Sequence, residues 1–163
     1  MKTVKFFYLL IIAGLLLMMC SFHQPCNNVP ELNKEIIAFI NSQLNKKVGT
    51  GECWDLAAAA LNKVGAKWDG KYLFGKEIDH KKNCVYEGDI IQFEGIELKY
   101  EKEKIIYFEK LEHHTAVIFQ VKDKGSYIIA DQNTGFSGKK VGTHALQIST
   151  ITKGKFKIFR PLK

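Results

Sequence analysis

The sequence predicts an α+β fold in which N-terminal helices pack on an antiparallel β-sheet. Two segments with helical periodicity come first, between residues 31 and 64. After residue 88 the chain consists of β-rich segments that are separated by glycines or charged turns. Helices followed by strands argue against a parallel sheet, because helices and strands alternate along the chain of a parallel sheet.

The composition is that of one ordinary globular domain. The chain has 163 residues, of which 25% are charged and 46% hydrophobic, far from the disordered and low-complexity classes. We assign residues 31–163 to a single domain, which is long enough to bury a proper hydrophobic core.

Residues 1–20 have the layout of a secretory signal. Lys2 and Lys5 precede an apolar run over residues 6–19, which is short for a helix that spans about 30 Å of hydrocarbon. We therefore expect a signal peptide over residues 1–20, a tether over residues 21–30, and an exported protein. The alternative is a retained membrane anchor.

Cys20 ends the apolar run and is a candidate site for lipidation. Met18 and Met19 argue against lipidation, because the residues before a lipidated cysteine are usually small. Two locations stay open: a periplasmic, outer-membrane-anchored lipoprotein, or a secreted protein. In either case we expect a monomer that meets a membrane only through Cys20.

Two helices are predicted before the sheet. Residues 31–47 place apolar side chains at helical spacing, with Glu31 in the first turn and Lys46 and Lys47 near the end. Glycines at positions 49 and 51 form a turn, and an alanine-rich helix over residues 52–64 follows and ends before Gly65.

The rest of the chain is predicted to be a long loop and then strands. The loop covers residues 68–86, where no periodicity is strong. A charged turn at residues 122–125 joins two of the strands into an antiparallel hairpin. The predicted strands cover residues 89–93, 96–100, 105–109, 115–122, 126–131, 146–151 and 155–160.

Cys53 is the candidate nucleophile, because it follows the glycine turn and lies in the first turn of the second helix. A thiolate at that position feels the positive end of the helix dipole and nearby unsatisfied N–H groups, which lower its pKa. Position alone also allows a buried structural cysteine. The backbone N–H of Cys53 is the oxyanion donor that the sequence offers.

His114 is the candidate base, because it opens the strand that pairs by hairpin with residues 126–131. The hairpin places the start of one strand beside the end of the next. Asp131 or Asn133 would then neighbour His114 and orient its imidazole ring by a hydrogen bond. His113 is the rival base, but only one of two neighbouring strand residues can face Cys53, and His114 shares its face with apolar residues.

The order of these motifs resembles the CHAP amidase/peptidase family and its NlpC-like relatives over about residues 32–136. The resemblance implies a papain-like fold with Cys53, His114 and Asp131 as the catalytic set, and Asn133 as a residue that assists or replaces the acid. The Gly-x-Cys-Trp-x-Leu-Ala segment is also similar to cysteine-proteinase-fold domains attached to some fungal cytoskeletal proteins. The matching motifs are Cys-x-Asp-Leu-Ala from Cys53, Gly-Asp-Ile-Ile-Gln-Phe from Gly88, His-x-Ala-Val from His114 and Asp-x-Asn from Asp131.

Cys26 and Cys84 remain as a candidate disulfide pair, since an exported protein folds in an oxidising compartment. No C-x-x-C or H-x-x-x-H spacing occurs, so the sequence predicts neither a metal site nor a cofactor. His80 and His144 are predicted to lie in exposed loops.

The chain carries a formal charge of +7, and loss of the two signal-peptide lysines would leave +5. Its lysines alternate with acidic or β-forming residues, which favours solvated strand faces over a nucleic-acid site.

Three functions fit these observations. The first is an exported thiol hydrolase that cleaves an amide bond of a peptide or a peptidoglycan stem peptide. The second is an inactive module on the same fold that binds a cell-surface peptide or protein. A secreted effector or inhibitor acting on a foreign cell is a third hypothesis.

Overall fold

The computed structural model describes residues 26, 28–102, 104–135 and 137–163. The predicted signal peptide and most of the predicted tether lie outside these residues, as does Cys20. Within the described part of the chain, no helix has both the length and the apolar character needed to cross a membrane.

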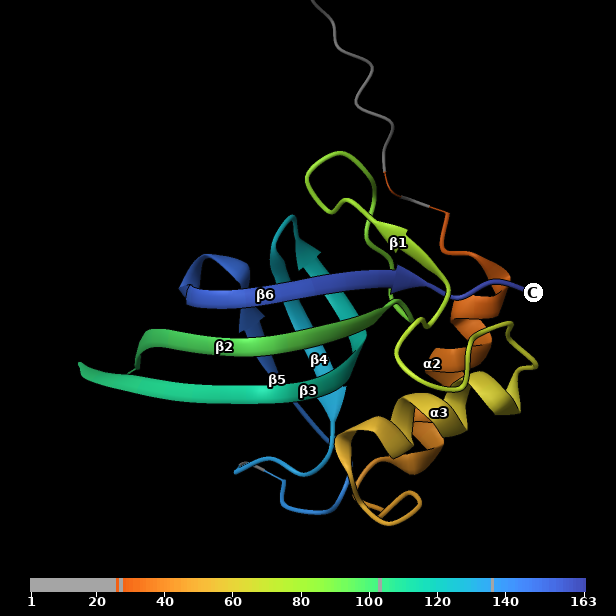
Figure 1. Ribbon diagram of the computed structural model, residues 1–163, viewed down its shortest axis with the longest axis horizontal. Helices are drawn as coiled ribbons and strands as arrows, with labels where there is room; N and C mark the ends of the chain where they lie inside the picture. The colour runs from red at the N-terminus through yellow and green to blue at the C-terminus, as the bar shows by residue number, and fades with distance from the viewer. Residues whose placement is uncertain (1–25, 27, 103, 136) are drawn as a thin grey trace, which may run out of the picture.

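Two helices, α2 (Glu31–Gln43) and α3 (Cys53–Lys63), pack side by side at one end of the sheet (Figure 1). Helix α2 ends earlier than predicted, because Leu44 is extended and forms a β-bridge with Val141. Lys46 and Lys47 therefore lie outside the helix, and no basic residue is found in its last turn.

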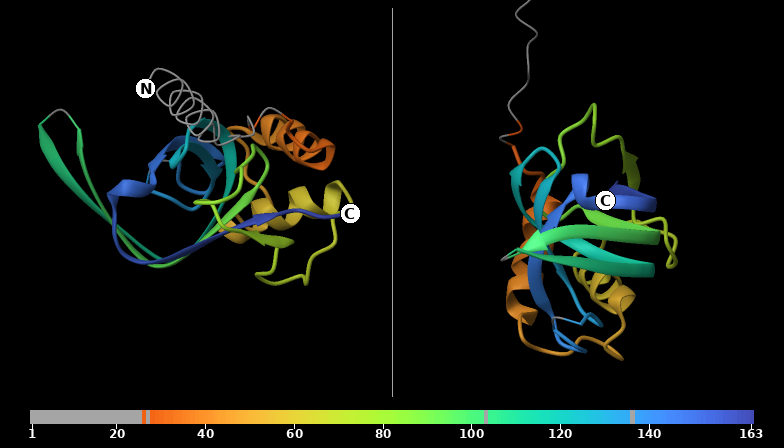
Figure 2. Two further views of the ribbon diagram at one scale, coloured as in Figure 1. Left: turned by 90° about the horizontal axis from the view of Figure 1, so that it is seen from above. Right: turned by 90° about the vertical axis from the view of Figure 1, so that its left-hand side faces the viewer.

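The sheet has six strands in the order β1-β6-β2-β3-β4-β5, and every neighbouring pair is antiparallel. It is strongly curved, as the two views of Figure 2 show. A short 3-10 helix, η1 (Ile148–Thr150), leads into the last strand. The strands are β1 (Lys76–Ile78), β2 (Ile90–Lys102), β3 (Ile105–Asp123), β4 (Ser126–Asp131), β5 (Gly142–Gln147) and β6 (Ile151–Arg160).

Several predicted boundaries were wrong. The predicted strands 89–93 and 96–100 form one strand, β2, and those at 105–109 and 115–122 form one strand, β3. The loop predicted over residues 68–86 contains β1, which pairs with β6. The strand predicted over residues 146–151 is replaced by the end of β5, by η1 and by the start of β6.

The core has two parts, one on each face of the sheet. The first lies between the helices and the sheet and includes Ile36, Leu56 and Val117. The second covers the other face and includes Phe93, Ile118 and Tyr127. Because both faces of the central strands are buried, consecutive residues of β3 from His114 to Ile118 are all buried.

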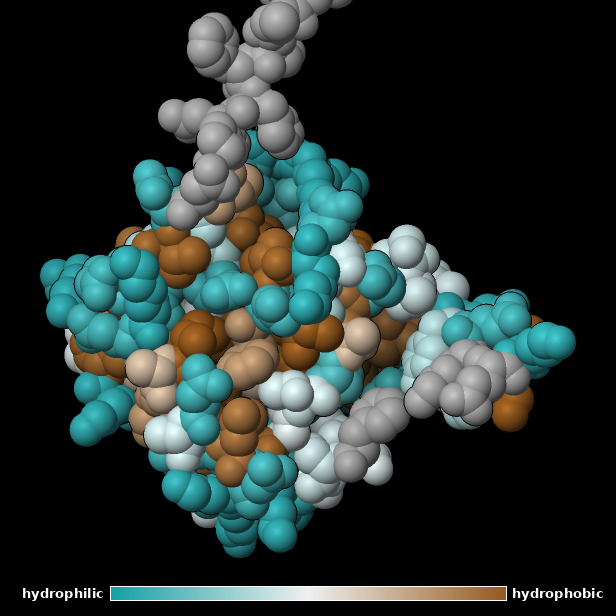
Figure 3. Space-filling model, turned by 180° about the vertical axis from the view of Figure 1, so that it is seen from behind, coloured by the Kyte–Doolittle hydropathy of each residue, from teal (hydrophilic) through white to brown (hydrophobic). Residues whose placement is uncertain are grey.

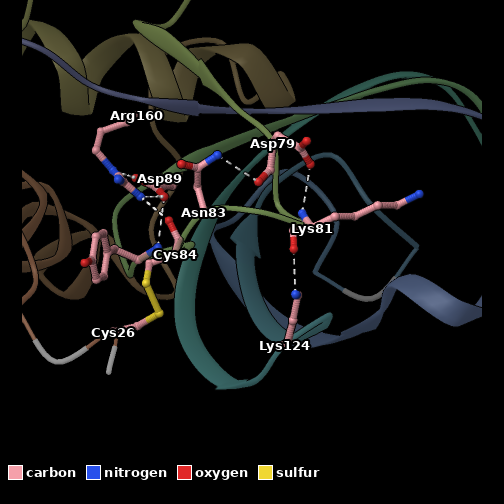
Figure 4. Close-up of a disulfide and its surroundings, with 9 residues drawn as sticks. Cys26, Asp79, Lys81, Asn83, Cys84, Asp89, Lys124 and Arg160 are labelled. Carbon is pink, nitrogen blue, oxygen red and sulfur yellow. Dashed lines mark hydrogen bonds and ion pairs between the residues drawn. A yellow bond between two sulfur atoms is a disulfide. The ribbon is translucent and has the colours of Figure 1, made fainter. Parts of the chain in front are cut away.

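The predicted disulfide between Cys26 and Cys84 is confirmed, with the two Cα atoms 5.6 Å apart (Figure 4). The carbonyl oxygen of Cys84 accepts a hydrogen bond from the Arg160 guanidinium at 2.7 Å. That guanidinium also binds the buried carboxylate of Asp89 at 2.7 Å. The disulfide thus fastens the segment before α2 to the loop that meets the end of β6.

Replacing Cys84 by serine is expected to lower the free energy of unfolding by about 2–4 kcal/mol, because the disulfide restricts the unfolded chain. Urea unfolding of the oxidised protein measures the effect. Cys26→Ser should give the same loss, and Cys53→Ser serves as the control in which the disulfide is kept. Equal stability of the Cys84→Ser variant and the wild-type protein would contradict this role of the disulfide.

Candidate active site

Cys53 is the first residue of helix α3, and a tight turn organised by Asp55 precedes it. One carboxylate oxygen of Asp55 accepts the backbone N–H of Thr50 at 2.7 Å, the hydroxyl of Thr50 at 2.6 Å and the N–H of Glu52 at 3.2 Å. Gly49 has a φ of +56°, and a Cβ atom there would lie 2.8 Å from the Asp55 carboxyl carbon. The turn needs a glycine because the carboxylate fills that space.

Gln132 ties the same turn to the sheet. It follows the last residue of β4 and is fully buried. Its amide oxygen accepts the N–H of Val48 at 3.1 Å, and its amide nitrogen donates to the carbonyls of Val48 at 2.9 Å and Glu52 at 2.8 Å. These three bonds hold the start of α3 beside the end of β4.

Replacing Gln132 by alanine is expected to cost about 2–3 kcal/mol of unfolding free energy, because it leaves buried backbone groups of Val48 unsatisfied. Chemical denaturation of both proteins measures the cost. The matched control is Gln147→Ala, since the Gln147 side chain is exposed and bonds only at the surface, to Ser126. That control should change stability by less than about 0.5 kcal/mol. Similar losses in both variants would contradict the structural role of Gln132.

His114 and Asp131 form a buried pair on neighbouring strands. The Nε2 atom of His114 lies 2.8 Å from a carboxylate oxygen of Asp131, and the two residues are 5% and 1% exposed. The imidazole also stacks on the ring of Phe93, with centroids 6.2 Å apart. The ring is therefore held in place by both a hydrogen bond and packing.

The pKa of His114 is raised to about 9. Burial alone would lower it, but the hydrogen bond and negative charge of Asp131, together with those of Cys53, outweigh the burial. His114 is thus protonated at neutral pH.

The Cys53 thiol lies beside β3, next to the point where the pairing of β3 with β4 ends. The last pair between these strands joins Val117 to Ala130, so the backbone of β3 before Val117 is open on that side. The Cys53 sulfur lies 4.0 Å from the carbonyl oxygen of His113. Because Nε2 of His114 is engaged by Asp131, its Nδ1 is the ring nitrogen left for the thiol.

The pKa of Cys53 is lowered from its ordinary value of 9.0. Partial burial of the thiol opposes this shift. It is outweighed by the hydrogen bond with His114, the backbone N–H of Thr115, the charge of His114 and the backbone N–H of Trp54. The arrangement favours a thiolate paired with an imidazolium.

His113, the rival base, lies on the surface with 42% of its side chain exposed. Its Nδ1 atom is 2.8 Å from a carboxylate oxygen of Glu94, and the ring of Tyr72 meets it edge-on at 4.4 Å. The structure thus brings His114, and not His113, together with Asp131.

The sequence predicted that either Asp131 or Asn133 orients the imidazole of His114, and Asn133 does not take that position. It adopts a left-handed conformation with φ 64° and donates its side-chain amide to Glu52 at 2.6 Å. The other carboxylate oxygen of Glu52 pairs with Lys139. Asn133 therefore turns toward the helix start, and Asp131 is the hydrogen-bond partner of His114.

Three further residues lie close to Cys53, His114 and Asp131, and the sequence alone gave them no role. They are Asp55, Gln132 and His144. His144 was expected in an exposed loop but lies on β5, with Nδ1 3.6 Å from the second carboxylate oxygen of Asp131. The role of Asp55 could have been predicted from the sequence, because an acidic residue in the first turn of a helix often caps the helix. No sequence pattern predicts the roles of Gln132 and His144, since their partners lie far away in the sequence.

The set can perform nucleophilic chemistry. A thiolate at a helix start, a protonated imidazole and a buried carboxylate that orients it form a nucleophile, an acid–base group and an orienting group. As the first residue of α3, Cys53 has an N–H without an intrahelical acceptor. Within the described residues, no group of three His, Cys, Asp or Glu side chains is arranged to hold a metal ion.

Two crystal structures of Ly7917 are similar in fold to this chain. One aligns at 16% identity with a TM-score of 0.49, and the other, with the hydrolyzing product of MDP, at 14% with a TM-score of 0.51. Each alignment covers 79% of this chain and 62% of the Ly7917 chain. At such low identity the likeness concerns the fold alone.

A comparison with curated proteins gives no match. The family model of the AIM3/BBC1 cysteine proteinase-fold domain, in contrast, matches residues 30–163, which include all of the described helices and strands. The match agrees with the papain-like fold expected from the sequence. The chain belongs to the family of AIM3/BBC1 cysteine proteinase-fold domains.

Proposed function

We propose that this protein is an exported thiol hydrolase that cleaves an amide bond. The observation that carries the proposal is the geometry of three side chains: Cys53 at the helix start, His114 beside it, and Asp131 2.8 Å from His114. The lowered pKa of Cys53 and the raised pKa of His114 are the shifts that such chemistry requires.

The proposed reaction has two halves. The Cys53 thiolate attacks the amide carbonyl carbon and forms a C–S bond, and the backbone N–H of Cys53 donates to the developing oxyanion. His114 gives its proton to the leaving amine as the C–N bond breaks, which leaves a thioester. Water then attacks the thioester and transfers a proton to His114. Collapse of the intermediate releases the carboxylic acid and the thiolate, while Asp131 holds the imidazole throughout.

Peptides of the cell wall are the first substrates to test. The motifs around Cys53 and His114 resemble those of the CHAP and NlpC families, and an exported enzyme would meet the cell surface. Ly7917, which shares the fold, was crystallised with the hydrolyzing product of MDP. We therefore include MDP and cell-wall peptides beside ordinary proteins among the substrates.

The test follows the release of new amino groups and carboxyl groups from these substrates. The purified protein is treated with substoichiometric amounts of iodoacetamide, and the alkylated fraction of Cys53 is measured by mass spectrometry. Hydrolysis should fall in proportion to the alkylated fraction. Hydrolysis that persists after complete alkylation of Cys53 would refute the proposed mechanism.

The alternative function is a binding module without catalysis. Exposed apolar side chains on the β2–β3 hairpin favour it, because such surfaces commonly bind partners. If Cys53 were alkylated at pH 6 no faster than an unstructured thiol and no substrate were cleaved, this alternative would replace the hydrolase.

A further inference from the structure

A second histidine meets the carboxylate that orients His114. Asp131 is 1% exposed, and its Oδ2 atom lies 2.8 Å from Nε2 of His114. Its other oxygen, Oδ1, lies 3.6 Å from Nδ1 of His144. The carboxylate therefore lies between two imidazoles, His114 from β3 and His144 from β5. Cys53 of α3 joins this group through its hydrogen bond with His114.

Strand β5 directs His144 inward rather than toward solvent. It is the last strand of the sheet and lies on the side of the molecule that Figure 3 shows. Its side chains alternate, since Thr143 and Ala145 are exposed while Leu146 is buried in the second part of the core. Successive residues of a strand point to opposite faces, so His144 shares the inner face with Leu146.

The register between β4 and β5 brings His144 to Asp131. His144 is paired directly with Ile129, and Asp131 is the next residue on the same face of β4. Diagonal neighbours of this kind lie within reach of an aromatic side chain. The direct partner of Asp131 on β5 is Gly142, which has no side chain. The imidazole of His144 can therefore approach the carboxylate.

The Oδ1 atom of Asp131 needs a donor. It is buried, and among the described residues no donor lies at ordinary hydrogen-bond length from it. A buried carboxylate oxygen without a donor is costly, and a donor favours the ionised form of the acid. Nδ1 of His144 is about half an ångström beyond hydrogen-bond length, so a small rotation of the imidazole completes the bond.

The state of Asp131 affects the thiolate through His114. Burial opposes protonation of His114, but the hydrogen bond and the charge of Asp131 help to raise its pKa to about 9. Partial burial likewise opposes ionisation of Cys53, and the hydrogen bond and the charge of His114 help to lower its pKa. A carboxylate that loses its ionised form or its orientation therefore weakens the thiolate two contacts away.

We propose that His144 is a positioning residue of the active site: it donates a hydrogen bond from Nδ1 to Oδ1 of Asp131 and so keeps this carboxylate ionised and directed at His114. The inference rests on the proposed function for its effect on catalysis. Its effect on the Cys53 thiolate is measured without a substrate.

Two substitutions separate this role from a structural one. His144→Leu removes the donor but suits the apolar inner face of β5, beside Leu146. His144→Asn keeps an N–H donor at the position of Nδ1, although asparagine is disfavoured in strands. The positioning role predicts that His144→Asn is the more active variant even if urea unfolding shows that it is the less stable one. A purely structural role predicts that activity follows stability.

In His144→Leu, kcat is expected to fall about 10-fold with KM within about twofold of the wild-type value, because a misaligned carboxylate affects the reaction more than substrate binding. The midpoint of Cys53 alkylation by iodoacetamide should move upward by about half a pH unit. His144→Asn should restore most of both losses. Steady-state kinetics and the pH dependence of alkylation measure these effects.

A check that needs no variant is the position of the proton on the His144 ring. Long-range proton–nitrogen NMR correlations distinguish Nδ1 from Nε2, and the proposal requires a proton on Nδ1 at neutral pH. A ring that carries its proton on Nε2 alone would overturn the proposal, because Nδ1 would then have nothing to donate.

Three results with the variants would also overturn it. The first is an unchanged kcat together with an unchanged alkylation midpoint in His144→Leu. The second is a loss in both variants that follows their free energies of unfolding, which would leave His144 a structural role only. The third is a downward shift of the midpoint in His144→Leu, because His144 would then withdraw charge from Asp131 rather than position it.

Failure of the proposed function is read separately. An upward shift of the midpoint in His144→Leu that His144→Asn reverses, in a protein that cleaves none of the substrates, would retain the role of His144 and refute the hydrolase. Hydrolysis that depends on Cys53 but is the same in His144→Leu as in the wild-type protein would retain the hydrolase and refute the role of His144.

Discussion

Replacing Cys53 by alanine is expected to abolish hydrolysis, with a loss of at least about 10⁴-fold in kcat, because Cys53 is the free thiol of the described residues and lies beside His114. The assay is the release of new amino groups from the best substrate found for the wild-type protein. The fold should survive the change, since Cys53 is only partly buried.

Cys53→Ser is the matched control for this prediction. It keeps the size and position of the nucleophile but replaces the thiol by a hydroxyl, which ionises far less readily. We expect its activity to be nearly as low as that of Cys53→Ala. If the alanine variant hydrolysed the substrate at more than about a hundredth of the wild-type rate, Cys53 would not be the nucleophile.

Replacing His114 by glutamine is expected to reduce kcat by about 10³–10⁴-fold, because it removes both the charge that stabilises the thiolate and the proton needed by the leaving amine. The pKa of Cys53 should also rise toward its ordinary value of 9.0. Steady-state kinetics and the pH dependence of thiol alkylation measure these two effects.

His113→Gln is the control for His114→Gln, since it changes the neighbouring, exposed histidine. It should leave kcat within a few-fold of the wild-type value and should not shift the pKa of Cys53. A larger loss of kcat in His113→Gln than in His114→Gln would exchange the roles assigned to the two residues.

The raised pKa of His114 also determines how stability and hydrolysis change with pH. Because the folded pKa of about 9 lies above the ordinary 6.5, binding of the proton stabilises the fold fully below about pH 6.5. That contribution is lost as the pH rises through about 9. Hydrolysis should decline over the same alkaline range, because the imidazolium that protonates the leaving amine disappears.

The order of helices and strands could be predicted because each has a clear period in the sequence. The strand boundaries could not be predicted in the same way, and Gly95 shows why. A glycine between two apolar segments is typical of a turn, but here it has φ 58° inside β2. Gly154 of β6 passes so close that a Cβ atom on it would lie 2.3 Å from the Gly95 carbonyl oxygen. The glycines permit close strand packing, which depends on the tertiary structure.

The same distinction applies to the site. The positions of Cys53, His114 and Asp131 could be predicted because local rules, a helix start and a hairpin, place each of them. Gln132 could not be found, since its partner Val48 is 84 residues away in the sequence. The role of Asn133 also depends on its contact with Glu52 across 81 residues, which no local pattern reveals.

The most direct test of the central claim is the rate of Cys53 alkylation by iodoacetamide between pH 5 and pH 10, with the site of modification identified by mass spectrometry. An ordinary thiol with a pKa of 9.0 is almost fully protonated at pH 6. The thiolate–imidazolium pair predicts that the alkylation rate titrates with a midpoint below the ordinary 9.0 and that His114→Gln moves this midpoint upward. A single titration with a midpoint near pH 9, unchanged in His114→Gln, would contradict the account.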